Sequence, residues 1–255
     1  MQKYRITLLI GFLALLPSYQ IRDIFQPPQM VIWNIGQGQW ATWVQGDQCS
    51  HFDVGGEYDQ SFKVSRLCAD KLNRIYLSHW DWDHIGLLGR FKGKANRICL
   101  ASPPVGTTTA KKQNLLAGIQ PCSTSDRAVF KIYSASPSFL STKNNKEPAA
   151  NHLSSVFWLH PNKWLLPGDS TIKEEKHWKT EVPAGTKYLL LGHHGSSTST
   201  SPELLGKLPQ VIGAISSARK SRYGHPHKVT IERLAQKKIP LLRTEDWGTL
   251  HFYQN

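Results

Sequence analysis

Four side chains that commonly bind metal ions lie within a run of six residues. The run from His79 to His84 follows the pattern H-x-D-x-D-H, so two histidines flank two aspartates. Imidazole and carboxylate groups together suit divalent ions of borderline or hard character. A concentration of these ligand types is hard to explain without a metal, and the run therefore predicts a metal site.

The stretches on either side of this run predict the elements that hold it. Residues 74–77 form an apolar strand that leads into the run, and residues 85–88 form the first turn of a helix packed behind it. Gly86 lets the chain turn closely between them. The metal site is therefore expected on a loop at the C-terminal end of a strand.

Other predicted strands also lead into polar residues. Residues 30–35, 40–44 and 49–54 predict a meander with glycine-containing turns. Residues 245–248 predict a hairpin turn between two late strands, with Asp246 close enough to touch the site. Strands that deliver polar residues to loops are typical of α/β folds, whose rigid scaffold positions the site. The remaining strands are expected at 155–159, 164–167, 188–191 and 211–215.

Length and composition predict one large domain with a strongly basic surface. The chain of 255 residues is 40% hydrophobic, which is enough to bury a full core. Lys and Arg number 31 against 18 Asp and Glu, and a polyanion such as nucleic acid or an anionic membrane is the natural partner. Solubility alone is the simpler alternative. Basic residues gather at Arg90, Lys92, Lys94 and Arg97, and at Arg219, Lys220, Arg222 and Lys228.

The N-terminal residues and the cysteines give information about the compartment. Residues 1–25 resemble a signal peptide or a membrane anchor, because two basic residues precede the uncharged run 6–16, which is too short to span a bilayer comfortably. A buried core helix is the alternative. The four cysteines form no C-x-x-C pair; they permit disulfides in an exported domain, with three possible pairings, or remain buried thiols. An extracytoplasmic location is therefore expected, with the domain exported or membrane-anchored.

Seven short motifs follow one another along the chain. They are Asn34-Ile35-Gly36-Gln37-Gly38, Asp53-Val54-Gly55-Gly56, the run Ser78 to Gly86, Asn151-His152-Leu153-Ser154, Leu166-Pro167-Gly168-Asp169, His193-His194-Gly195-Ser196 and Tyr223-Gly224-His225-Pro226-His227. In this order they resemble the metallo-β-lactamase fold and, more closely, the soluble domain of the ComEC family of DNA-uptake channel proteins. The resemblance covers about residues 31–250 and implies an α/β fold, the αββα sandwich, over residues 26–255.

The resemblance also implies which residues bind metal. Hydrolases of this fold usually read H-x-H-x-D-H, whereas this chain has Asp81 in place of the second histidine, as ComEC-type domains tend to. Asn151 occupies the position of a further first-site histidine, with His152 as an alternative if the loop turns. The implied ligands are His79, Asp81 and Asn151 for a first metal, and Asp83, His84 and His194 for a second, with Asp169 bridging both.

The ligand set indicates the metal and the reaction. Oxygen donors at Asp81 and Asn151 favour Mn²⁺, with Zn²⁺ or Mg²⁺ as alternatives. Two such ions about 3.5–4 Å apart activate water and stabilise a leaving oxygen, which is phosphodiester hydrolysis. Asp83, His193 and His225 are the expected catalytic residues. Substrate contacts are expected from His193, Ser196, His225 and Arg222.

Two further side-chain types remain open in function. Asp53 either orients a metal-binding imidazole or forms a turn at the end of a strand. Trp80 and Trp82 alternate with the predicted ligands, so they either stack on unpaired bases or fill the core.

The leading functional prediction is a metal-dependent nuclease that acts on DNA during uptake and natural transformation. Single-stranded DNA and the membrane channel domain of a ComEC-type protein are the expected partners, and no nucleotide cofactor is expected. One alternative is a DNA-guiding domain whose metal site is weak or vestigial. Another is a small-substrate phosphodiesterase such as a phosphorylcholine esterase, which the basic surface disfavours.

Overall fold

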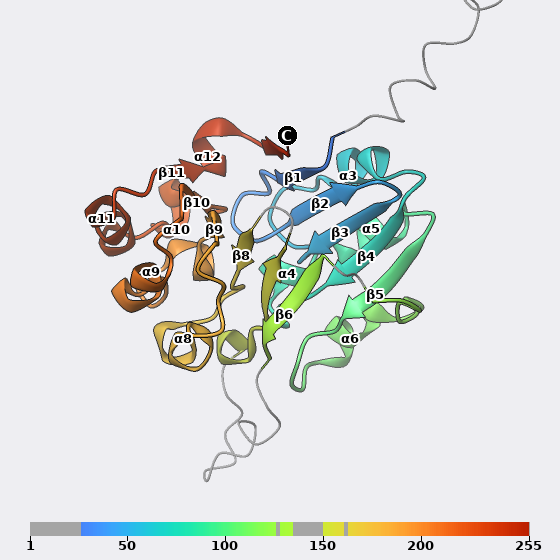
Figure 1. The fold of residues 1–255 in the computed structure, drawn as a ribbon. Coiled ribbons are helices and arrows are strands. Elements are labelled where there is room, and N and C mark those ends of the chain that lie inside the picture. The colour runs from blue at the N-terminus through green and yellow to red at the C-terminus, as the bar shows by residue number, and fades with distance from the viewer. Residues whose placement is uncertain (1–26, 126–127, 135–149, 161–162, 255) are drawn as a thin grey trace, which may run out of the picture.

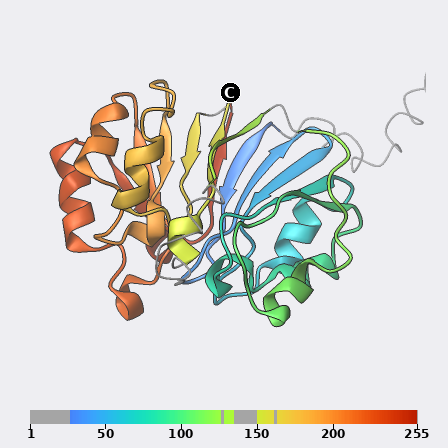
Figure 2. The ribbon, with the colours of Figure 1, turned by 90° about the horizontal axis from the view of Figure 1, so that it is seen from below.

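Two six-stranded β-sheets pack face to face, and helices cover their outer faces (Figure 1). The computed structural model describes residues 27–125, 128–134, 150–160 and 163–254. Seen from below, the two sheets lie between one group of helices from the first half of the chain and another from the second half (Figure 2). This arrangement confirms the predicted αββα sandwich.

The first sheet contains the predicted meander and the strand that leads into the metal run. Its order is β12-β1-β2-β3-β4-β5, with β1 to β3 antiparallel and β3 to β5 parallel. The strands are β1 (Gln29–Ile32), β2 (Ala41–Gln45), β3 (Gln48–Phe52), β4 (Leu72–Tyr76), β5 (Ile98–Ser102) and β12 (Leu250–Tyr253). The helices of this half are α3 (Ser61–Leu67), α4 (Trp82–Ile85), α5 (Leu88–Lys92) and α6 (Ala110–Leu116).

The second sheet has the order β11-β10-β9-β8-β7-β6, in which β8 to β11 are parallel. Its strands are β6 (Val129–Tyr133), β7 (Val156–Leu159), β8 (Trp164–Leu166), β9 (Tyr188–Leu190), β10 (Gly213–Ser216) and β11 (Leu241–Arg243). The α-helices are α8 (Ile172–Trp178), α9 (Pro202–Lys207), α10 (Lys220–Tyr223), α11 (Lys228–Gln236) and α12 (Thr244–Trp247). Two short 3₁₀ helices complete this half, η1 (Ala150–Leu153) and η2 (Gly192–Gly195).

Strand residues are buried on both faces because each sheet has a neighbour on either side. In β1, Met30 and Ile32 face the layer between the sheets, while Val31 packs in the layer between the first sheet and its helices. This alternation follows the two-residue period of a strand. The second sheet packs in the same way, with Phe157 in the layer between the sheets and Trp158 toward the helices. The two sheets therefore form a rigid base for the loops at their ends.

The predicted hairpin at residues 245–248 is wrong. The segment forms the single turn α12, which connects β11 of the second sheet with β12 of the first. Gly248 does end this turn, so the turn signal is genuine, but β12 pairs with β1 rather than with β11. Local sequence gives no information about this distant partner. Asp246 is exposed and pairs with Arg243, so it does not contact the predicted site.

The four cysteines form two disulfides, Cys49–Cys68 and Cys99–Cys122. The first joins β3 to the end of α3, and the second joins β5 to the segment that follows α6. The structure thus selects one of the three pairings. The predicted signal-like or anchor segment, residues 1–25, lies outside the described residues. Among the residues that are described, no helix is long and apolar enough to cross a membrane.

Candidate metal centre

The predicted metal run lies where β4 ends and α4 begins. Asp81 is the N-cap of α4, and His84 is completely buried in its last turn. The backbone of the run is held by two earlier segments, because Gln39 N donates to Asp83 O at 2.9 Å and Val54 N donates to His84 O at 2.7 Å. The turns of the meander therefore hold the backbone of the metal run in place.

Gly55 shows how closely these segments approach. A Cβ atom at this position would lie 2.3 Å from the carbonyl carbon of Asp83 and 2.4 Å from His84 N. Any larger side chain would displace the backbone of the metal run. The packing of the site therefore requires Gly55, the first glycine of the Asp53-Val54-Gly55-Gly56 motif.

Hydrogen bonds to Nδ1 fix the orientation of three buried imidazoles. His84 Nδ1 donates to Asp53 Oδ2 at 2.7 Å. Ser78 Oγ donates to the same carboxylate oxygen at 2.8 Å, so it accepts from His79 Nδ1 at 2.9 Å. His194 Nδ1 donates to the carbonyl oxygen of Ser217 at 3.1 Å. In their neutral forms, all three rings therefore present Nε2, with its lone pair, to one space.

The carboxylates of Asp169 and Asp83 face these Nε2 atoms. Asp169 Oδ1 lies 3.0 Å from His84 Nε2 and 3.6 Å from His194 Nε2, while its Oδ2 lies 3.8 Å from His79 Nε2. Asp83 Oδ2 lies 3.1 Å from His194 Nε2. Two overlapping groups have ligand atoms within 4.8 Å of one another: His79, His84 and Asp169, and Asp83, His84 and His194. We call these five residues the metal cluster.

The donor set of the metal cluster fits a divalent cation. His84 Nε2 and His194 Nε2 are only 3.3 Å apart, so the lone pairs of the two neutral rings repel unless a proton or a metal ion lies between them. His79 Nε2 and Asp169 Oδ1 are buried and make no well-aligned hydrogen bond with any described residue. Buried polar atoms without partners are costly, so a ligand that coordinates them is expected.

The charges of the metal cluster reinforce one another. Burial on its own lowers the pKa of His84, but the carboxylates of Asp169 and Asp53 raise that pKa well above its usual value. Burial on its own raises the pKa of Asp169, but His84 and His194 lower it well below its usual value. The pKa of Asp83 is likewise lowered by His194 and His84 against the effect of burial. The cluster therefore attracts a positive charge, whether a proton or a metal ion.

Two of the three predicted first-site residues, Asp81 and Asn151, lie less centrally than the second-site residues, whereas His79 belongs to the metal cluster. Asp81 is partly exposed, and its Oδ2 lies 3.5 Å from His79 Nε2. Asn151 Nδ2 lies 3.2 Å from His193 Nε2, so the structure brings Asn151 to the edge of the cluster through His193. The alternative ligand, His152, is directed elsewhere, because its Nδ1 lies 2.7 Å from Glu174 Oε1.

The predicted catalytic histidines form one side of the site. His193 Nε2 lies 3.7 Å from Asp169 Oδ2, and the rings of His193 and His225 are 5.9 Å apart between centroids. Burial is the main cause that lowers the pKa of both imidazoles; the neighbouring histidines lower it further, whereas Asp169 raises it. His193 and His194 both adopt positive φ angles, 47° and 57°, a rare backbone conformation that clusters at functional sites.

The two other predicted substrate contacts are held by neighbouring residues. Ser196 Oγ lies 3.0 Å from Thr198 Oγ1, which in turn lies 3.4 Å from His193 Nδ1. Arg222 pairs with Glu57 at 3.0 Å and remains largely exposed. The structure thus connects Ser196 to His193 through Thr198, whereas it shows Arg222 bound to an acidic residue.

Sequence reasoning missed several residues that position the site. Gln39 donates to Asp53 Oδ2 at 2.8 Å, and Ser217 O accepts from His194. Glu57 binds Arg219 and Arg222, which fastens the basic loop to the turn that precedes α3. Such contacts join residues far apart in sequence. Only Asp53 was singled out, and its orienting contact with His84 is present.

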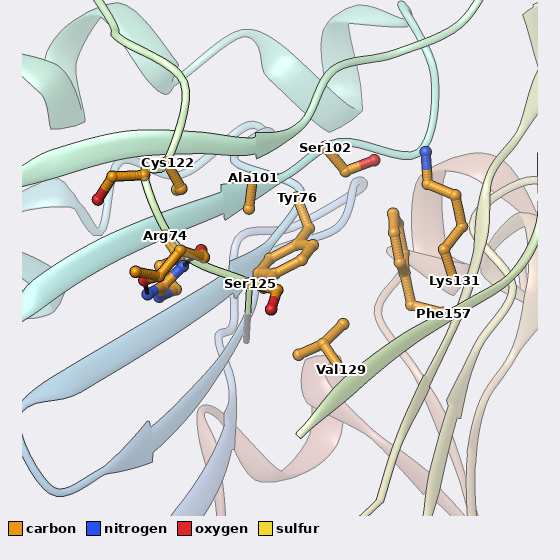
Figure 3. Close-up of a pocket in the computed structure, with 11 residues that line it drawn as sticks. Arg74, Tyr76, Ala101, Ser102, Cys122, Ser125, Val129, Lys131 and Phe157 are labelled. Carbon is orange, nitrogen blue, oxygen red and sulfur yellow. Dashed lines mark hydrogen bonds between the residues drawn. The ribbon is translucent and has the colours of Figure 1, made fainter. Parts of the chain in front are cut away.

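A separate pocket of about 380 Å³ opens beside the strands β4, β5 and β6 (Figure 3). Tyr76, Ser102, Lys131 and Phe157 are among its lining residues. None of the predicted site residues lines it. The metal cluster is therefore a distinct feature of the fold.

The fold matches two solved structures, one of which is a metallo-β-lactamase-fold protein. A metallo-β-lactamase fold protein, YhfI, from Bacillus subtilis aligns over 88% of this chain and all of its own, with a TM-score of 0.56 and 11% identity. The E377D mutant of CmlA β-hydroxylase aligns over 90% of this chain and 55% of its own, with a TM-score of 0.54 and 10% identity. At such low identity these matches show the fold alone, and the class defined is a metallo-β-lactamase-fold domain.

Curated relatives define the family more closely. ComE operon protein 3 of Bacillus subtilis is 29% identical over 200 residues, which cover 72% of this chain and 25% of that protein. Recombination protein 2 of Haemophilus influenzae is 30% identical over 188 residues, covering 72% and 23% respectively. Competence protein ComA of Neisseria gonorrhoeae is 26% identical over 264 residues, covering 99% and 36%. No family model matches the chain.

These relatives and the fold together identify the protein as a ComEC-type metallo-β-lactamase-fold domain. The chain spans between about a quarter and a third of the length of these relatives. The resemblance stated from the seven motifs is therefore confirmed.

Proposed function

We propose that this domain hydrolyses phosphodiester bonds of DNA in a metal-dependent reaction during DNA uptake. The observation that carries the proposal is the convergence of three imidazole Nε2 atoms on the carboxylates of Asp83 and Asp169. The chain has a formal net charge of +13, which favours a polyanionic substrate. Competence-related relatives support a role connected with DNA uptake.

Each part of the site has a role in the proposed reaction. The metal cluster would hold divalent metal, Mn²⁺ by preference, with Asp169 facing the imidazoles of both predicted sites and Asp81 and Asn151 at the edge. Metal bound there would supply an activated water and neutralise charge on the phosphate and the leaving oxygen. Asp53, Ser78 and Ser217 orient the ligand imidazoles, which raises their basicity as ligands.

His193 and His225 would serve the phosphate. Lowered pKa values keep both rings neutral near pH 7, and a neutral imidazole donates from one nitrogen and accepts at the other. His225 Nδ1 makes no hydrogen bond with any described residue. We assign to this pair the binding of a phosphate oxygen through a ring N–H. A proton that either ring accepts from the attacking water would then pass to the leaving oxygen.

A DNA-guiding domain with a weak metal site is the second candidate. The observation that favours it is Asn151, which contacts His193 rather than a residue of the metal cluster. An amide is a weaker ligand for transition metals than the imidazole that the wider fold usually places there. In this candidate the protein binds DNA but does not cut it.

Cleavage of DNA by purified protein distinguishes the two candidates. Single- and double-stranded DNA would be incubated with Mn²⁺, Mg²⁺ or Zn²⁺ beside the variants Asp83→Ala and His84→Ala. We expect cleavage by the wild type and its loss in both variants, because each removes a ligand of the metal cluster. Cleavage that survives both substitutions would exclude the assigned site. DNA binding with a steep salt dependence and no cleavage would support the guiding role.

The two disulfides support the proposed extracytoplasmic location. Disulfides persist in oxidising compartments and are rare in the cytosol of most organisms. The domain would then meet DNA outside the cytoplasm, next to the membrane channel of a ComEC-type protein. We further propose that residues 1–25 act as the export signal or anchor and that residues 26–255 form the domain.

A further inference from the structure

The two tryptophans of the metal run have different environments. Trp80 is 9% exposed, packs in the layer between the first sheet and its helices, and donates from Nε1 to Gly106 O at 3.1 Å. Trp82 is 45% exposed, although it lies between Asp81 and Asp83 in sequence. Large aromatic side chains are costly to expose. Trp80 therefore fills the core, whereas the exposure of Trp82 lacks a packing explanation.

Two lysines of α6 accompany the exposed ring. Lys111 Nζ lies 5.3 Å from the ring centroid of Trp82, and Lys112 Nζ lies 5.7 Å from it. Lys112 Nζ is also 3.6 Å from Asp81 Oδ1. An aromatic surface and two positive charges thus lie together at the edge of the metal cluster. An exposed ring beside cationic groups is the combination that single-strand binding proteins use for bases and phosphates.

We propose that Trp82, Lys111 and Lys112 form a platform for one nucleotide of a single DNA strand. An unpaired base stacks on the indole of Trp82, and the lysines bind the phosphates that flank this base. The inference rests on the proposed function, because it places the stacked nucleotide next to the phosphodiester that the metal cluster attacks. It adds a preference for single-stranded DNA and names the residues that produce this preference.

The preference follows from the geometry of the two substrates. Bases in a duplex are already stacked on their neighbours, so Trp82 gains a base surface only if the duplex is disrupted. In a single strand the base is free to leave its neighbours and stack on the ring. The lysines, by contrast, bind phosphates of either substrate. Loss of the ring should therefore weaken single-strand binding selectively, whereas loss of the lysines should weaken both.

Equilibrium binding tests the platform without requiring cleavage. Fluorescence anisotropy would measure binding of a 12-nucleotide oligothymidylate and a 12-base-pair duplex to the whole chain, in buffer with a chelator. We expect Trp82→Ala to weaken single-strand binding roughly 5- to 150-fold, as expected for the loss of one stacked base, and to change duplex binding little. Trp82→Phe should restore most of the affinity. Lys111→Gln and Lys112→Gln should each lower the salt slope by about 0.7 on the single strand.

A matched control separates stacking from a general effect of surface tryptophan. Trp247 is 68% exposed on α12, so Trp247→Ala should leave both affinities unchanged. The melting temperature and the manganese content of Trp82→Ala should equal those of the wild type, which shows that the fold and the metal cluster remain. Equal single-strand affinity for wild type and Trp82→Ala would overturn the platform while leaving a nuclease function intact. Equal loss for single strand and duplex would overturn it as well. Selective loss in a protein that never cuts DNA would support the platform and reject the nuclease.

Discussion

Two groups of buried side chains in this protein combine residue types that bind metals, yet only one is suited to do so. Cys49, His51 and Cys68 place potential ligand atoms as close together as the metal cluster does. The two cysteines are joined in a disulfide, and both nitrogens of His51 have protein partners. Its Nε2 donates to Asn73 Oδ1 at 2.9 Å, while its Nδ1 accepts from Trp40 Nε1 at 3.3 Å.

The metal cluster differs from the His51 group in charge and in the direction of its lone pairs. Among the described residues, the hydrogen-bond partners of the His51 ring include no carboxylate. Burial lowers the pKa of His51 to about 4. Two carboxylates face His84, and they raise its pKa well above the usual value despite burial. Proximity of ligand types is therefore a weak criterion for a metal site. A stronger criterion is a set of imidazole nitrogens that have no protein partner and point toward carboxylates.

The largest expected effect is the loss of metal on substitution of Asp169. Asp169→Asn keeps the size of the side chain but removes the negative charge that faces His84, His194 and His79. We expect bound metal and DNA cleavage to fall to near background, because within the described part of the chain no other carboxylate lies near all three of these imidazoles. Elemental analysis of protein loaded with Mn²⁺ would measure the change.

The His51 group provides the matched control for this substitution. His51→Gln alters a histidine that is as deeply buried as His84 but lies in the uncharged group. Its metal content should equal that of the wild type. If His51→Gln also releases metal, or Asp169→Asn retains it, then the distinction between the two groups is incorrect.

A smaller effect concerns stability in acid. The pKa of His51 is lowered to about 4 from a usual 6.5, so the unfolded chain binds a proton that the folded chain rejects between these values. Stability is therefore fully present above about pH 6.5 and decreases as the pH falls toward 4, by about 3 kcal/mol at most. Urea unfolding of the metal-free protein at several pH values would measure this loss.

The same series in His51→Gln isolates the contribution of this residue. Its free energy of unfolding should fall less between pH 6.5 and 4 than that of the wild type. The raised pKa of His84 has the opposite sign, since the stability it provides is present below pH 6.5 and is lost as the pH rises through the folded-state value. Equal acid sensitivity in the wild type and in His51→Gln would show that His51 is not the group responsible.

The sequence predicted the frame of the site better than its contacts. The strand before the H-x-D-x-D-H run and the αββα architecture could be predicted from the sequence, because short apolar strands followed by polar turns carry a local signal. The structure does bring His79, Asp83, His84, Asp169 and His194 together, although they come from three separate segments of the chain. Ordered motifs made this predictable, whereas spacing within any one motif did not.

Other features depend on contacts that local sequence does not encode. The pairing of β12 with β1 turned an expected hairpin into a crossover between sheets. The direction of His152 depends on Glu174, which also forms the capping box of α8. Trp80 and Trp82 look equivalent in the sequence, and only packing against the first sheet separates a buried ring from an exposed one.

The smallest expected effect is a change in metal preference at the edge of the cluster. Asn151 lies beside His193, whose Nε2 is 3.7 Å from Asp169 Oδ2. Asn151→His would add an imidazole where an amide stands, and imidazole suits zinc better than oxygen donors do. We expect the ratio of zinc to manganese bound from an equimolar mixture to rise modestly, as measured by elemental analysis after dialysis.

Asn151→Asp is the control, because it keeps an oxygen donor and should preserve or strengthen the preference for manganese. A higher zinc ratio in Asn151→His alone would mean that position 151 contributes to the choice of metal, which favours a first site that is occupied in the working protein. The same ratio in wild type and both variants would place Asn151 outside the coordination of any metal. The cluster would then depend on the five central residues, and the guiding role would gain support over hydrolysis.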